Sequence, residues 1–574
     1  MKHALGRSVS SEHRERIPID ALPLPVFVPR DHPMTVPPAY DLVIVGCGPV
    51  GALAANLAAQ AGLATLVIDR DSAPHILPRA VHLDHEMMRL FQGVGLAAAI
   101  APTMRETEGH LHIGADHGVI RYMGTAGRPK PFGWANDYFF YQPELEALLR
   151  DGFVQAPTVT VSLDTTLDGF VQDDAGVSVK LGRNATTDTV RARWVIACDG
   201  ARSDTRKALG IALDDLDFEE SWLVVDAHVD QPVRFPDLWG VPEAANLQQL
   251  SVMMCDPQRP ATIVPGRGNI RRWEFMLLPG EDDAAMMQPD AVAALLKPYL
   301  DGVPYDLIRA TTYRFHGLIA ERWRDGRVFL AGDAAHQTPP FFGQGMCHGM
   351  RDVANLIWKL ALVEQGDADA ALLDTYQVER DPHVRSVVSA AVAAGRYICE
   401  LDPERAAERD AAMRAQHAGT SGRTAADLIP AYTSGAIAAG TRGAGERFIQ
   451  PWIGGDAKIL DTVTGGGWRL FAIDAAATAD VSASPTLAAL SALDLTIVDA
   501  AALDDGGVVG RWLKLRGARF VLVRPDFYVF GVANEDLAAL LMQARTALHL
   551  HAPKPESAVA ELSAAVSAPA RGVR

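Results

Sequence analysis

The chain has 574 residues, of which 48% are hydrophobic and 21% are charged, and its formal net charge is −17. At roughly 150 residues per domain, this length predicts three to four domain-sized units with enough apolar material for a large core. The composition excludes disorder, collagen and coiled coil as the dominant state. An acidic chain also disfavours nucleic acid and anionic membranes as partners.

The first 39 residues are polar and then rich in proline, which predicts a flexible leader. The leader lacks the apolar core of a signal peptide, and the chain has no run of about 18 apolar residues, the length that a membrane span needs. The five cysteines lie far apart without a Cys-x-x-Cys pair, so neither a disulfide framework nor a zinc site is expected. These features favour a cytoplasmic protein.

Residues 40–69 predict a strand, a turn, a helix and a second strand in succession. The strand at 40–45 leads into Gly46-Cys47-Gly48-Pro49-Val50-Gly51, the helix follows at 52–61, and the second strand lies at 64–69. In such a GxGxxG the first glycine permits a tight turn, the second lets the backbone approach a pyrophosphate, and the third lets helix and strand pack closely. The helix N-terminus favours phosphate, and the acid after the second strand is placed to bind ribose. The predicted dinucleotide-binding residues are Gly46, Gly48, Pro49, Val50, Gly51, Asp69 and Arg70.

Short β-like runs fill residues 158–196 and 221–278, and the second set predicts one antiparallel sheet inserted between nucleotide-binding segments. A buried strand at 327–331 precedes a helix at 349–363, whose apolar residues recur at helical spacing. After residue 445, short strands and two helices predict a compact α/β unit. The predicted domains are a flexible leader (1–39), a discontinuous nucleotide-binding domain (40–211 and 311–400), a β-sheet domain (212–310), a helix and linker (401–440), a C-terminal domain (441–552) and a flexible tail (553–574).

Two further motifs follow predicted strands. One is Cys198-Asp199-Gly200-Ala201-Arg202-Ser203, and the other is Gly332-Asp333-Ala334-Ala335-His336, with Pro339-Pro340 and Gly343-Gln344-Gly345-Met346 close behind it. Together with the N-terminal fingerprint, and in this order, they resemble the single-component FAD-dependent aromatic hydroxylases, which have the para-hydroxybenzoate hydroxylase fold. The resemblance covers about residues 40–400.

Within that family, the segments 141–146, 222–226 and 272–281 resemble the 3-(3-hydroxyphenyl)propionate hydroxylases. The C-terminal Leu522-Val523-Arg524-Pro525-Asp526 resembles the thioredoxin-like tail of phenol hydroxylase relatives. That tail has no cysteine here, which excludes dithiol chemistry and leaves a structural role. The resemblance implies an α/β fold with a Rossmann-like FAD-binding domain, an inserted antiparallel-sheet substrate domain and a C-terminal thioredoxin-like domain.

The resemblance also implies roles for individual residues. Asp333 would meet the ribityl hydroxyls of FAD, which are donors that suit a carboxylate. The backbone N–H groups of 343–346, ahead of a helix, would face the flavin edge that becomes anionic on reduction. Asp199-Gly200 is associated in the family with both FAD and the nicotinamide nucleotide. The implied FAD contacts beyond the fingerprint are Arg79, Gln142, Asp199, Gly200, Gly332, Asp333, Gly345 and Met346, and the implied catalytic positions are Pro340, Gly343, Gln344 and Gly345.

Several side chains have both a functional and a structural interpretation. Substrate contact is a hypothesis for Trp273, Phe275, Tyr141 and Pro339, although core packing explains Trp273 and Phe275 at least as well. Arg271 and Arg272 could pair with a substrate carboxylate, but a solvated strand edge is the favoured interpretation. His110 and His112 alternate on one strand face, and because a metal would need a third ligand, no metal site is predicted.

The activity implied by the resemblance is that of an FAD-dependent monooxygenase. It would hydroxylate a phenolic aromatic acid such as 3-(3-hydroxyphenyl)propionate through a C4a-hydroperoxyflavin, using NADH or NADPH and O2. No second GxGxxG exists, so the reductant is expected to bind transiently. The expected partners are the aromatic substrate, O2 and NAD(P)H, with no nucleic acid and no membrane; a homodimer is an open expectation.

Alternatives remain on the same scaffold. A tailoring hydroxylase or epoxidase could act on an aromatic polyketide or another polycyclic phenol, because a wider pocket is all that it requires. A flavin halogenase is disfavoured, since the chain has no Trp-x-Trp. A flavin-binding sensor without turnover is disfavoured by the intact downstream motifs.

Overall fold

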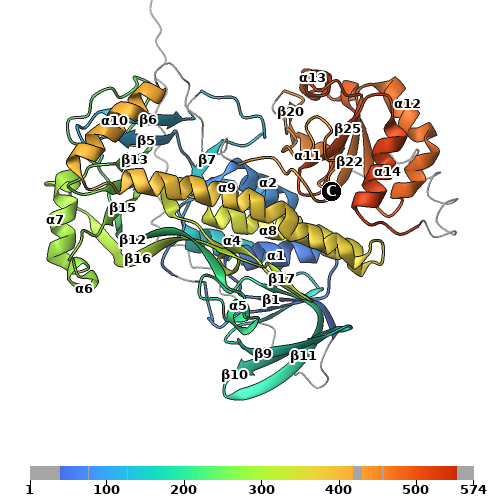
Figure 1. Cartoon of the computed structure of the whole chain (residues 1–574), viewed down its shortest axis with the longest axis horizontal. Helices are drawn as coiled ribbons and strands as arrows, with labels where there is room; N and C mark the ends of the chain where they lie inside the picture. The colour runs from blue at the N-terminus through green and yellow to red at the C-terminus, as the bar shows by residue number, and fades with distance from the viewer. Residues whose placement is uncertain (1–38, 75, 126, 418–428, 456–457, 553–574) are drawn as a thin grey trace, which may run out of the picture.

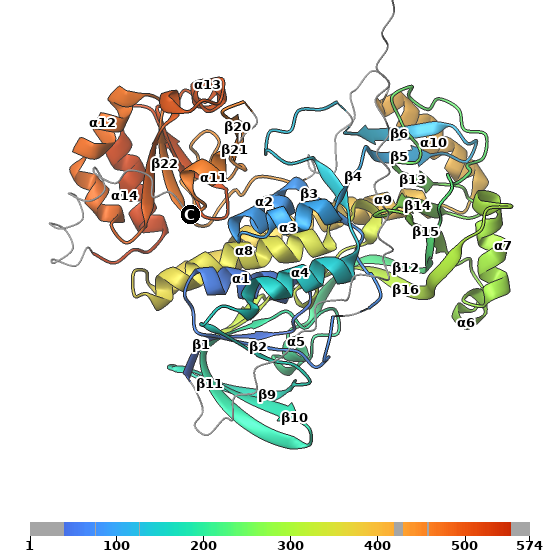
Figure 2. The ribbon, with the colours of Figure 1, turned by 180° about the vertical axis from the view of Figure 1, so that it is seen from behind.

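The computed structural model describes residues 39–552, apart from positions 75, 126, 418–428 and 456–457. The predicted tail, and the predicted leader except Ala39, therefore lie outside the described residues. The described chain contains two eight-stranded sheets, a separate four-stranded sheet near the C-terminus, a three-stranded sheet and a two-stranded sheet. Two long helices, α8 (Gly345–Glu364) and α9 (Thr375–Ile398), cross the middle of the molecule (Figure 1, Figure 2).

The first large sheet is built on β1 (Ala39–Val45), the apolar strand that leads into the fingerprint. β1 pairs in parallel with β2 (Thr65–Ile68) on one side and with β11 (Thr186–Ala197) on the other. One face of β1 packs on helices and the other on a β-hairpin, which explains its continuous apolar run. The remaining elements of this part are β8 (Val159–Ser162), β9 (Thr166–Asp173), β10 (Gly176–Arg183), β17 (Arg324–Asp325), β18 (Val328–Leu330), α1 (Pro49–Gln60), α4 (Gln142–Val154) and α5 (Asp204–Ala208).

The second large sheet has the strand order β19-β16-β12-β15-β14-β13-β5-β6. It differs from the predicted sheet in two ways: residues 109–124, 306–320 and 336–337 supply four of its strands, and the pair formed by β5 and β13 is parallel. Sequence adjacency does not reveal such a pair, because parallel strands need a long connection. The strands are β5 (Gly109–Ile113), β6 (Val119–Gly124), β12 (Leu213–His228), β13 (Ser251–Met254), β14 (Ala261–Pro265), β15 (Ile270–Met276), β16 (Asp306–Ala320) and β19 (His336–Gln337).

Shorter elements connect these layers. A three-stranded sheet of order β3-β7-β4 lies beside the two large sheets. The central helix α8 begins at Gly345, four residues before the predicted start. The connecting elements are β3 (His82–Asp84), β4 (Arg105–Glu106), β7 (Asp137–Phe139), α2 (His85–Gly93), α3 (Ala97–Ile100), α6 (Asp283–Met286), α7 (Pro289–Leu300) and α10 (Pro403–His417).

The C-terminal unit has a four-stranded sheet of order β23-β22-β24-β25. Its first two strands are parallel, and the other two pairs are antiparallel. Its elements are β20 (Trp452–Ile453), β21 (Lys458–Ile459), β22 (Trp468–Ala472), β23 (Leu495–Asp499), β24 (Phe520–Val523), β25 (Val529–Ala533), α11 (Leu460–Thr464), α12 (Ala475–Ala483), α13 (Val508–Leu515) and α14 (Leu537–Ala547).

Buried ion pairs attach this unit to the rest of the chain. Arg524, just after β24, donates to both oxygens of Glu379 on α9 at 3.0 and 2.8 Å. Arg89 on α2 makes a second two-pronged contact, with Asp461 on α11, at 2.6 and 2.9 Å. Because all four side chains are buried, the pairs require the two parts to stay in contact. Among the described helices, none has the length and apolar character to cross a membrane.

Candidate active site

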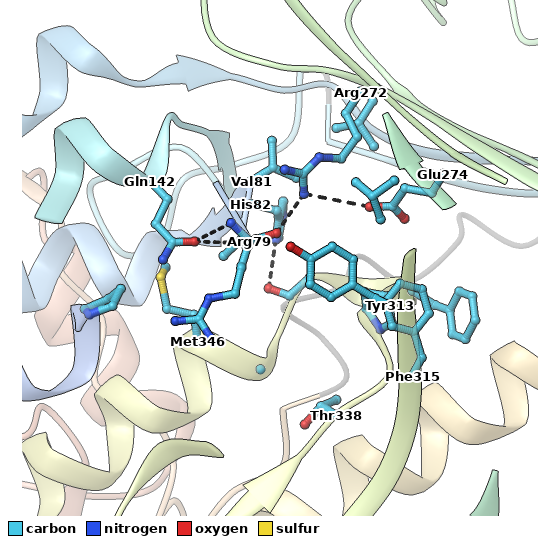
Figure 3. A pocket seen from close by; sticks show the side chains of 18 of the residues that line it. Arg79, Val81, His82, Gln142, Arg272, Glu274, Tyr313, Phe315, Thr338 and Met346 are labelled. Carbon is cyan, nitrogen blue, oxygen red and sulfur yellow. Dashed lines mark hydrogen bonds and ion pairs between the residues drawn. The ribbon is translucent and has the colours of Figure 1, made fainter. Parts of the chain in front are cut away.

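A cavity of about 320 Å³ lies beside the carboxyl end of β1. Its walls come from the second large sheet, from the fingerprint turn, from residues that directly follow β11 and β18 of the first sheet, and from the segment that leads into α8 (Figure 3). In open α/β sheets, ligands bind outside the carboxyl ends of the parallel strands. The cavity therefore occupies the position in which the fingerprint predicts a nucleotide, and it extends from there to the second sheet.

The fingerprint turn is closed by contacts that only glycine allows. Gly46 has φ +98°, and a Cβ there would lie 2.4 Å from the carbonyl oxygen of Cys198. A Cβ on Gly51 would lie 1.9 Å from the carbonyl oxygen of Gly46. Gly48, Pro49 and Val50 line the cavity.

Asp69 and Arg70 are not among the cavity-lining residues. The Asp69 carboxylate instead accepts hydrogen bonds from the backbone N–H of Cys47 at 2.6 Å and of Asp71 at 2.9 Å. It therefore ties the end of β2 to the fingerprint turn, and Arg70 is exposed. A ribose contact of Asp69 remains a prediction.

Arg79 and Gln142 lie together on one wall. The side-chain carbonyl of Gln142 accepts hydrogen bonds from the backbone N–H of Arg79 at 2.8 Å and of Ala80 at 2.7 Å. On the other side, the Arg272 guanidinium donates to the Arg79 carbonyl at 2.7 Å. These bonds fix the backbone at Arg79, while its side chain borders the cavity (Figure 3).

The two downstream motifs meet across the cavity. Gly200, with φ +78°, and Asp333 both line it. Desolvation raises the pKa of the Asp333 carboxyl, and the Arg79 charge opposes that shift. One oxygen of Asp199 accepts from Thr205 at 3.0 and 2.8 Å, and the other is buried without a hydrogen-bond partner among the described residues.

The segment that enters α8 forms the floor. Pro340 lines the cavity, Gly343 takes φ +61°, and Gly345 and Met346 bring the N-terminus of α8 to the same space. Gln344 is fully buried instead, and its side-chain carbonyl accepts from the Arg351 guanidinium at 3.2 Å. Pro339 and Gln344 are not among the lining residues, and Gly332 lies behind the cavity, where its N–H donates to Asp352 at 3.0 Å.

For strand β15, the structure supports the core-packing interpretation of Trp273 and Phe275 and not their contact with substrate. Trp273 and Phe275 are 0% and 2% exposed and pack in the core of the second sheet, whereas Arg272 and Glu274 line the cavity. The solvated edge favoured for the two arginines is wrong, because Arg271 is 8% and Arg272 is 2% exposed. Successive strand residues point to opposite faces, so a one-residue offset exchanges core and cavity.

Tyr141, the remaining substrate candidate, does not line the cavity. It is half-buried at the N-cap position of α4, directly before Gln142. Burial raises the pKa of its phenol, and the nearby Asp226 carboxylate acts in the same direction. Its substrate contact remains a prediction.

The residues that sequence reasoning missed form, together with Arg272, a buried ion-pair group on the second sheet. Asp226 on β12 accepts from Arg272 at 2.7 and 3.1 Å and from Arg309 Nε on β16 at 2.6 Å. Arg309 Nη1 donates to the Tyr313 hydroxyl at 2.7 Å, and Nη2 is buried without a hydrogen-bond partner in the described chain. Desolvation raises the pKa of Glu274, and the Arg272 guanidinium, with Nη1 3.8 Å from Glu274 Oε1, opposes that shift.

These features fit FAD. The glycine cradle at the end of β1 has room for phosphates, and the N-terminus of α8 presents N–H groups to the same cavity. Around it, Asp199 Oδ1 and Thr338 Oγ1 are buried polar atoms that lack partners among the described residues, as expected of groups that a polar ligand satisfies.

Two family models match the sequence. The one described as "FAD binding domain" matches residues 39–391, and the one described as "HcaD C-terminal domain" matches residues 445–547. The chain is also similar over most of its length to curated proteins. A Rhodococcus jostii (strain RHA1) protein named "Probable NADH-specific resorcinol 4-hydroxylase" is 34% identical over 534 residues, which cover 90% of this chain and 96% of that protein.

A Burkholderia cenocepacia (strain HI2424) protein named "3-(3-hydroxy-phenyl)propionate/3-hydroxycinnamic acid hydroxylase" is 33% identical over 538 residues, or 87% of this chain and 94% of that protein. Among solved structures, aklavinone-11 hydroxylase with FAD and aklavinone is similar with a TM-score of 0.70 and 25% identity, over 89% of this chain and 99% of that one. The monooxygenase PieE with FAD and substrate has a TM-score of 0.74 at 23% identity, over 89% and 99%, and shares the fold.

Proposed function

The chain belongs to the family of FAD-dependent aromatic hydroxylases, and from this membership we propose that its substrate is a phenolic aromatic acid such as 3-(3-hydroxyphenyl)propionate. The protein uses FAD and NADH or NADPH. The proposal concerns which aromatic ring enters the cavity, and it rests on the ion-pair group at the second sheet.

The unpartnered Nη2 of Arg309 carries the proposal. A buried guanidinium N–H without an acceptor is costly, and a substrate carboxylate is the acceptor with the strongest match to it. The two guanidiniums of Arg309 and Arg272 face the Asp226 carboxylate and a Glu274 carboxyl whose pKa is raised by desolvation. A carboxylate at Arg309 Nη2 would supply the acceptor that this guanidinium lacks among the described residues, and a phenylpropionate carries a carboxylate near neutral pH.

The nucleotide side of the cavity would hold FAD. Gly46–Gly51 would receive the pyrophosphate, Asp333 the ribityl hydroxyls, and the N-terminus of α8 at Gly345 and Met346 the flavin ring. The chemistry that FAD supplies when bound is reduction by NAD(P)H followed by transfer of one oxygen atom from O2 to the aromatic ring.

The protein's own part is to orient the ring and to exclude water. Phe139, Phe315 and Phe341 line the cavity together with Met253 and Val224, and they form an apolar wall around the space for the ring. Such a wall protects a reactive oxygen species from water and fixes which ring carbon faces the cofactor. Anchoring the carboxylate at Arg309 would place the phenolic end toward Pro340 and Gly343.

A neutral dihydroxybenzene is a second candidate. The relative named as a resorcinol hydroxylase is 34% identical to this chain, and the Glu274 carboxyl, which lines the cavity, can accept from a second ring hydroxyl. A polycyclic phenol is the third, supported by the likeness to aklavinone-11 hydroxylase.

Steady-state kinetics with these three substrate types test the proposal. We expect the highest kcat/KM with 3-(3-hydroxyphenyl)propionate, a lower value with resorcinol, and no product with an anthraquinone. Equal kcat/KM for the acid and for its amide, which lacks the negative charge, would contradict the role of the guanidinium pair.

We also propose that the C-terminal unit is thioredoxin-like and structural. Its order β23-β22-β24-β25, with one parallel and two antiparallel pairs, supports this assignment. The buried contact between Arg524 and Glu379 supports a role in holding α9, which packs beside α8. The predicted domain limits stay a proposal, with residues 109–124, 311–320 and 336–337 added to the second sheet.

A further inference from the structure

A cluster of three ionisable side chains, which we call the histidine cluster, lies at the cavity wall: His82 on β3, His110 on β5 and Asp137 on β7. All three are at most 4% exposed, and both histidines line the cavity. The nitrogen and oxygen atoms that they offer all lie within 4.8 Å of one another. Nothing in the function proposed above uses them.

We propose that the histidine cluster binds a divalent transition metal such as Zn²⁺, and that metal bound there inhibits hydroxylation. The metal site is independent of the proposed function, whereas the inhibition rests on it. Two imidazoles and one carboxylate are a donor set that suits zinc, copper, iron and nickel, and three protein ligands leave further coordination positions for water. Mg²⁺ prefers oxygen ligands and is not expected to bind.

Several atoms of the cluster lack the partners that buried polar atoms ordinarily have. Neither ring nitrogen of His110 has a hydrogen-bond partner among the described residues, and the same holds for Asp137 Oδ2. Leaving a buried polar atom without a partner is costly, and a ligand, an ion or water ordinarily satisfies it. Because the atoms of the cluster lie so close together, one cation can satisfy a nitrogen of His110 and the Asp137 carboxylate at once.

The contacts of His82 give the arrangement of a metal-binding imidazole. Nε2 lies 3.0 Å from Asp137 Oδ1, which is about the separation of two adjacent ligands that each lie roughly 2.1 Å from an octahedrally coordinated metal. Nδ1 lies 3.4 Å from the Gly343 carbonyl oxygen, to which it donates when Nε2 binds the metal. Histidine ligands ordinarily donate their second ring N–H to a carbonyl or a carboxylate, and this bond fixes the ring.

A metal at this place takes the position of a proton. Burial lowers the pKa of His82, but the hydrogen bond and charge of Asp137 raise it above 6.5. The proton between Nε2 and Oδ1 therefore leaves to solvent when the metal binds, and the carboxylate keeps its negative charge. Burial lowers the pKa of His110 to about 4, so this ring is neutral at neutral pH and has a lone pair for the metal.

The fold brings the ligands together at the junction of two sheets. His82 and Asp137 lie at diagonal positions of the antiparallel pair β3 and β7, while β5 belongs to the second large sheet. A Cβ on Gly343 would lie 2.6 Å from His82 Nδ1, so only glycine lets the segment entering α8 reach the ring (Figure 3). For His110 the sequence offered His112 as a second ligand and no third, and the junction supplies the other two ligands from elsewhere.

Metal in this position stands in the space that the aromatic ring needs. His82 and His110 line the same cavity as Phe139 and Met253, which belong to the apolar wall around that space. The remaining coordination positions of the metal face this space, because both histidines border it. A hydrated cation there would replace apolar contact with the ring, so Zn²⁺ is expected to lower kcat/KM for the aromatic substrate.

Two binding measurements on the FAD-loaded protein test the site without turnover. In a calorimetric titration, Zn²⁺ should bind one-to-one and Mg²⁺ should not bind. Cu²⁺, which binds such sites most tightly among these metals, should give an electron paramagnetic resonance spectrum with splitting from two nitrogen ligands. Oxidised FAD has no unpaired electron and adds no signal.

His110→Phe is the most informative variant, because it keeps a ring and breaks no hydrogen bond among the described residues. It should weaken Zn²⁺ binding by more than about 100-fold, the most that loss of an outer partner of a ligand costs, and should leave splitting from one nitrogen. Asp137→Asn should weaken Zn²⁺ binding as well. His316→Asn is the matched control and should keep the wild-type affinity, because His316 does not line the cavity and faces Glu219 at 3.8 Å.

Inhibition is tested in the hydroxylation assay. Zn²⁺ at about ten times its Kd should lower kcat/KM about tenfold, because only the metal-free fraction acts, and a chelator should restore it. Absence of stoichiometric binding, unchanged Zn²⁺ affinity in folded His110→Phe, a Cu²⁺ spectrum without nitrogen splitting, or full activity of the zinc-loaded protein would each overturn the inference. If the protein hydroxylates no phenol, the proposed function fails, and the titration and the spectrum still decide the metal site.

Discussion

Replacing Arg309 by methionine tests the anchor for the substrate carboxylate. Methionine keeps much of the apolar stem and removes the guanidinium with its two hydrogen bonds, to Asp226 and to Tyr313. Asp226 retains its two hydrogen bonds from Arg272, at 2.7 and 3.1 Å, so the variant leaves no carboxylate without a partner. We therefore expect a folded protein whose ion-pair group has lost one positive charge.

The magnitude follows from the one hydrogen bond that Arg309 Nη2 would make with the substrate. A hydrogen bond to a charged group contributes about 1.5–3 kcal/mol, which corresponds to about a 10- to 150-fold loss in kcat/KM for 3-(3-hydroxyphenyl)propionate. An anchor distant from the reacting carbon binds ground state and transition state alike, so the loss should appear mainly in KM. Arg309→Lys keeps the positive charge and should recover part of the lost kcat/KM.

The assay is oxidation of NADH with the hydroxylated product quantified, for the acid and for resorcinol in parallel. Resorcinol has no carboxylate, so its kcat/KM should stay near the wild-type value in Arg309→Met. An equal loss for both substrates would refute the anchor and would show that Arg309 acts only through the packing around Asp226 and Tyr313.

Three other outcomes follow from contacts described above. Gly51→Ala should purify without flavin, because its Cβ would lie 1.9 Å from the Gly46 carbonyl oxygen. The control Gly510→Ala has open space at its Cβ and should keep a full complement of flavin, as measured by absorbance. Arg524→Met should lower the free energy of unfolding by about 3–5 kcal/mol, measured by denaturant titration, because it leaves the Glu379 carboxylate buried without its main partner. Burial alone would raise the pKa of Glu379, but Arg524 holds it at about 2, so the free energy of unfolding should fall as the pH drops from 4.5 toward 2. Arg524→Met should weaken that pH dependence. A variant with the wild-type dependence would contradict the assignment.

The fingerprint was predictable from the sequence because its constraints are local. Gly46 and Gly51 are five residues apart, and the turn, the helix start and the strand before it all follow from adjacent residues. Helix α8 was predicted from its apolar spacing, but its first turn was missed because Gly345 and Met346 contribute no apolar period. The resemblance had already assigned Gly345 and Met346 to the site, and the structure places them in the first turn of α8 rather than ahead of the helix.

The substrate side was less predictable because it depends on which strand face meets the cavity. The strand 272–276 was identified, yet the alternation of side chains along a strand does not tell which set faces the core and which set faces the cavity. Arg309 and Tyr313 come from β16, which pairs with β12 across about 80 residues of chain, and a single sequence holds no signal for that register. His82 lines the cavity from β3, three residues after Arg79. Its hydrogen bond with Asp137 depends on the pairing of β3 with β7, which the sequence does not reveal.

The most direct test of the account is one turnover experiment with isotopically labelled O2. The purified protein, loaded with FAD and supplied with NADH or NADPH, should convert 3-(3-hydroxyphenyl)propionate to a product that has gained one labelled oxygen atom. Label in the product would establish oxygen transfer to a phenolic acid. Nicotinamide oxidation that yields only hydrogen peroxide with every phenol offered, or a protein that binds no FAD, would contradict it.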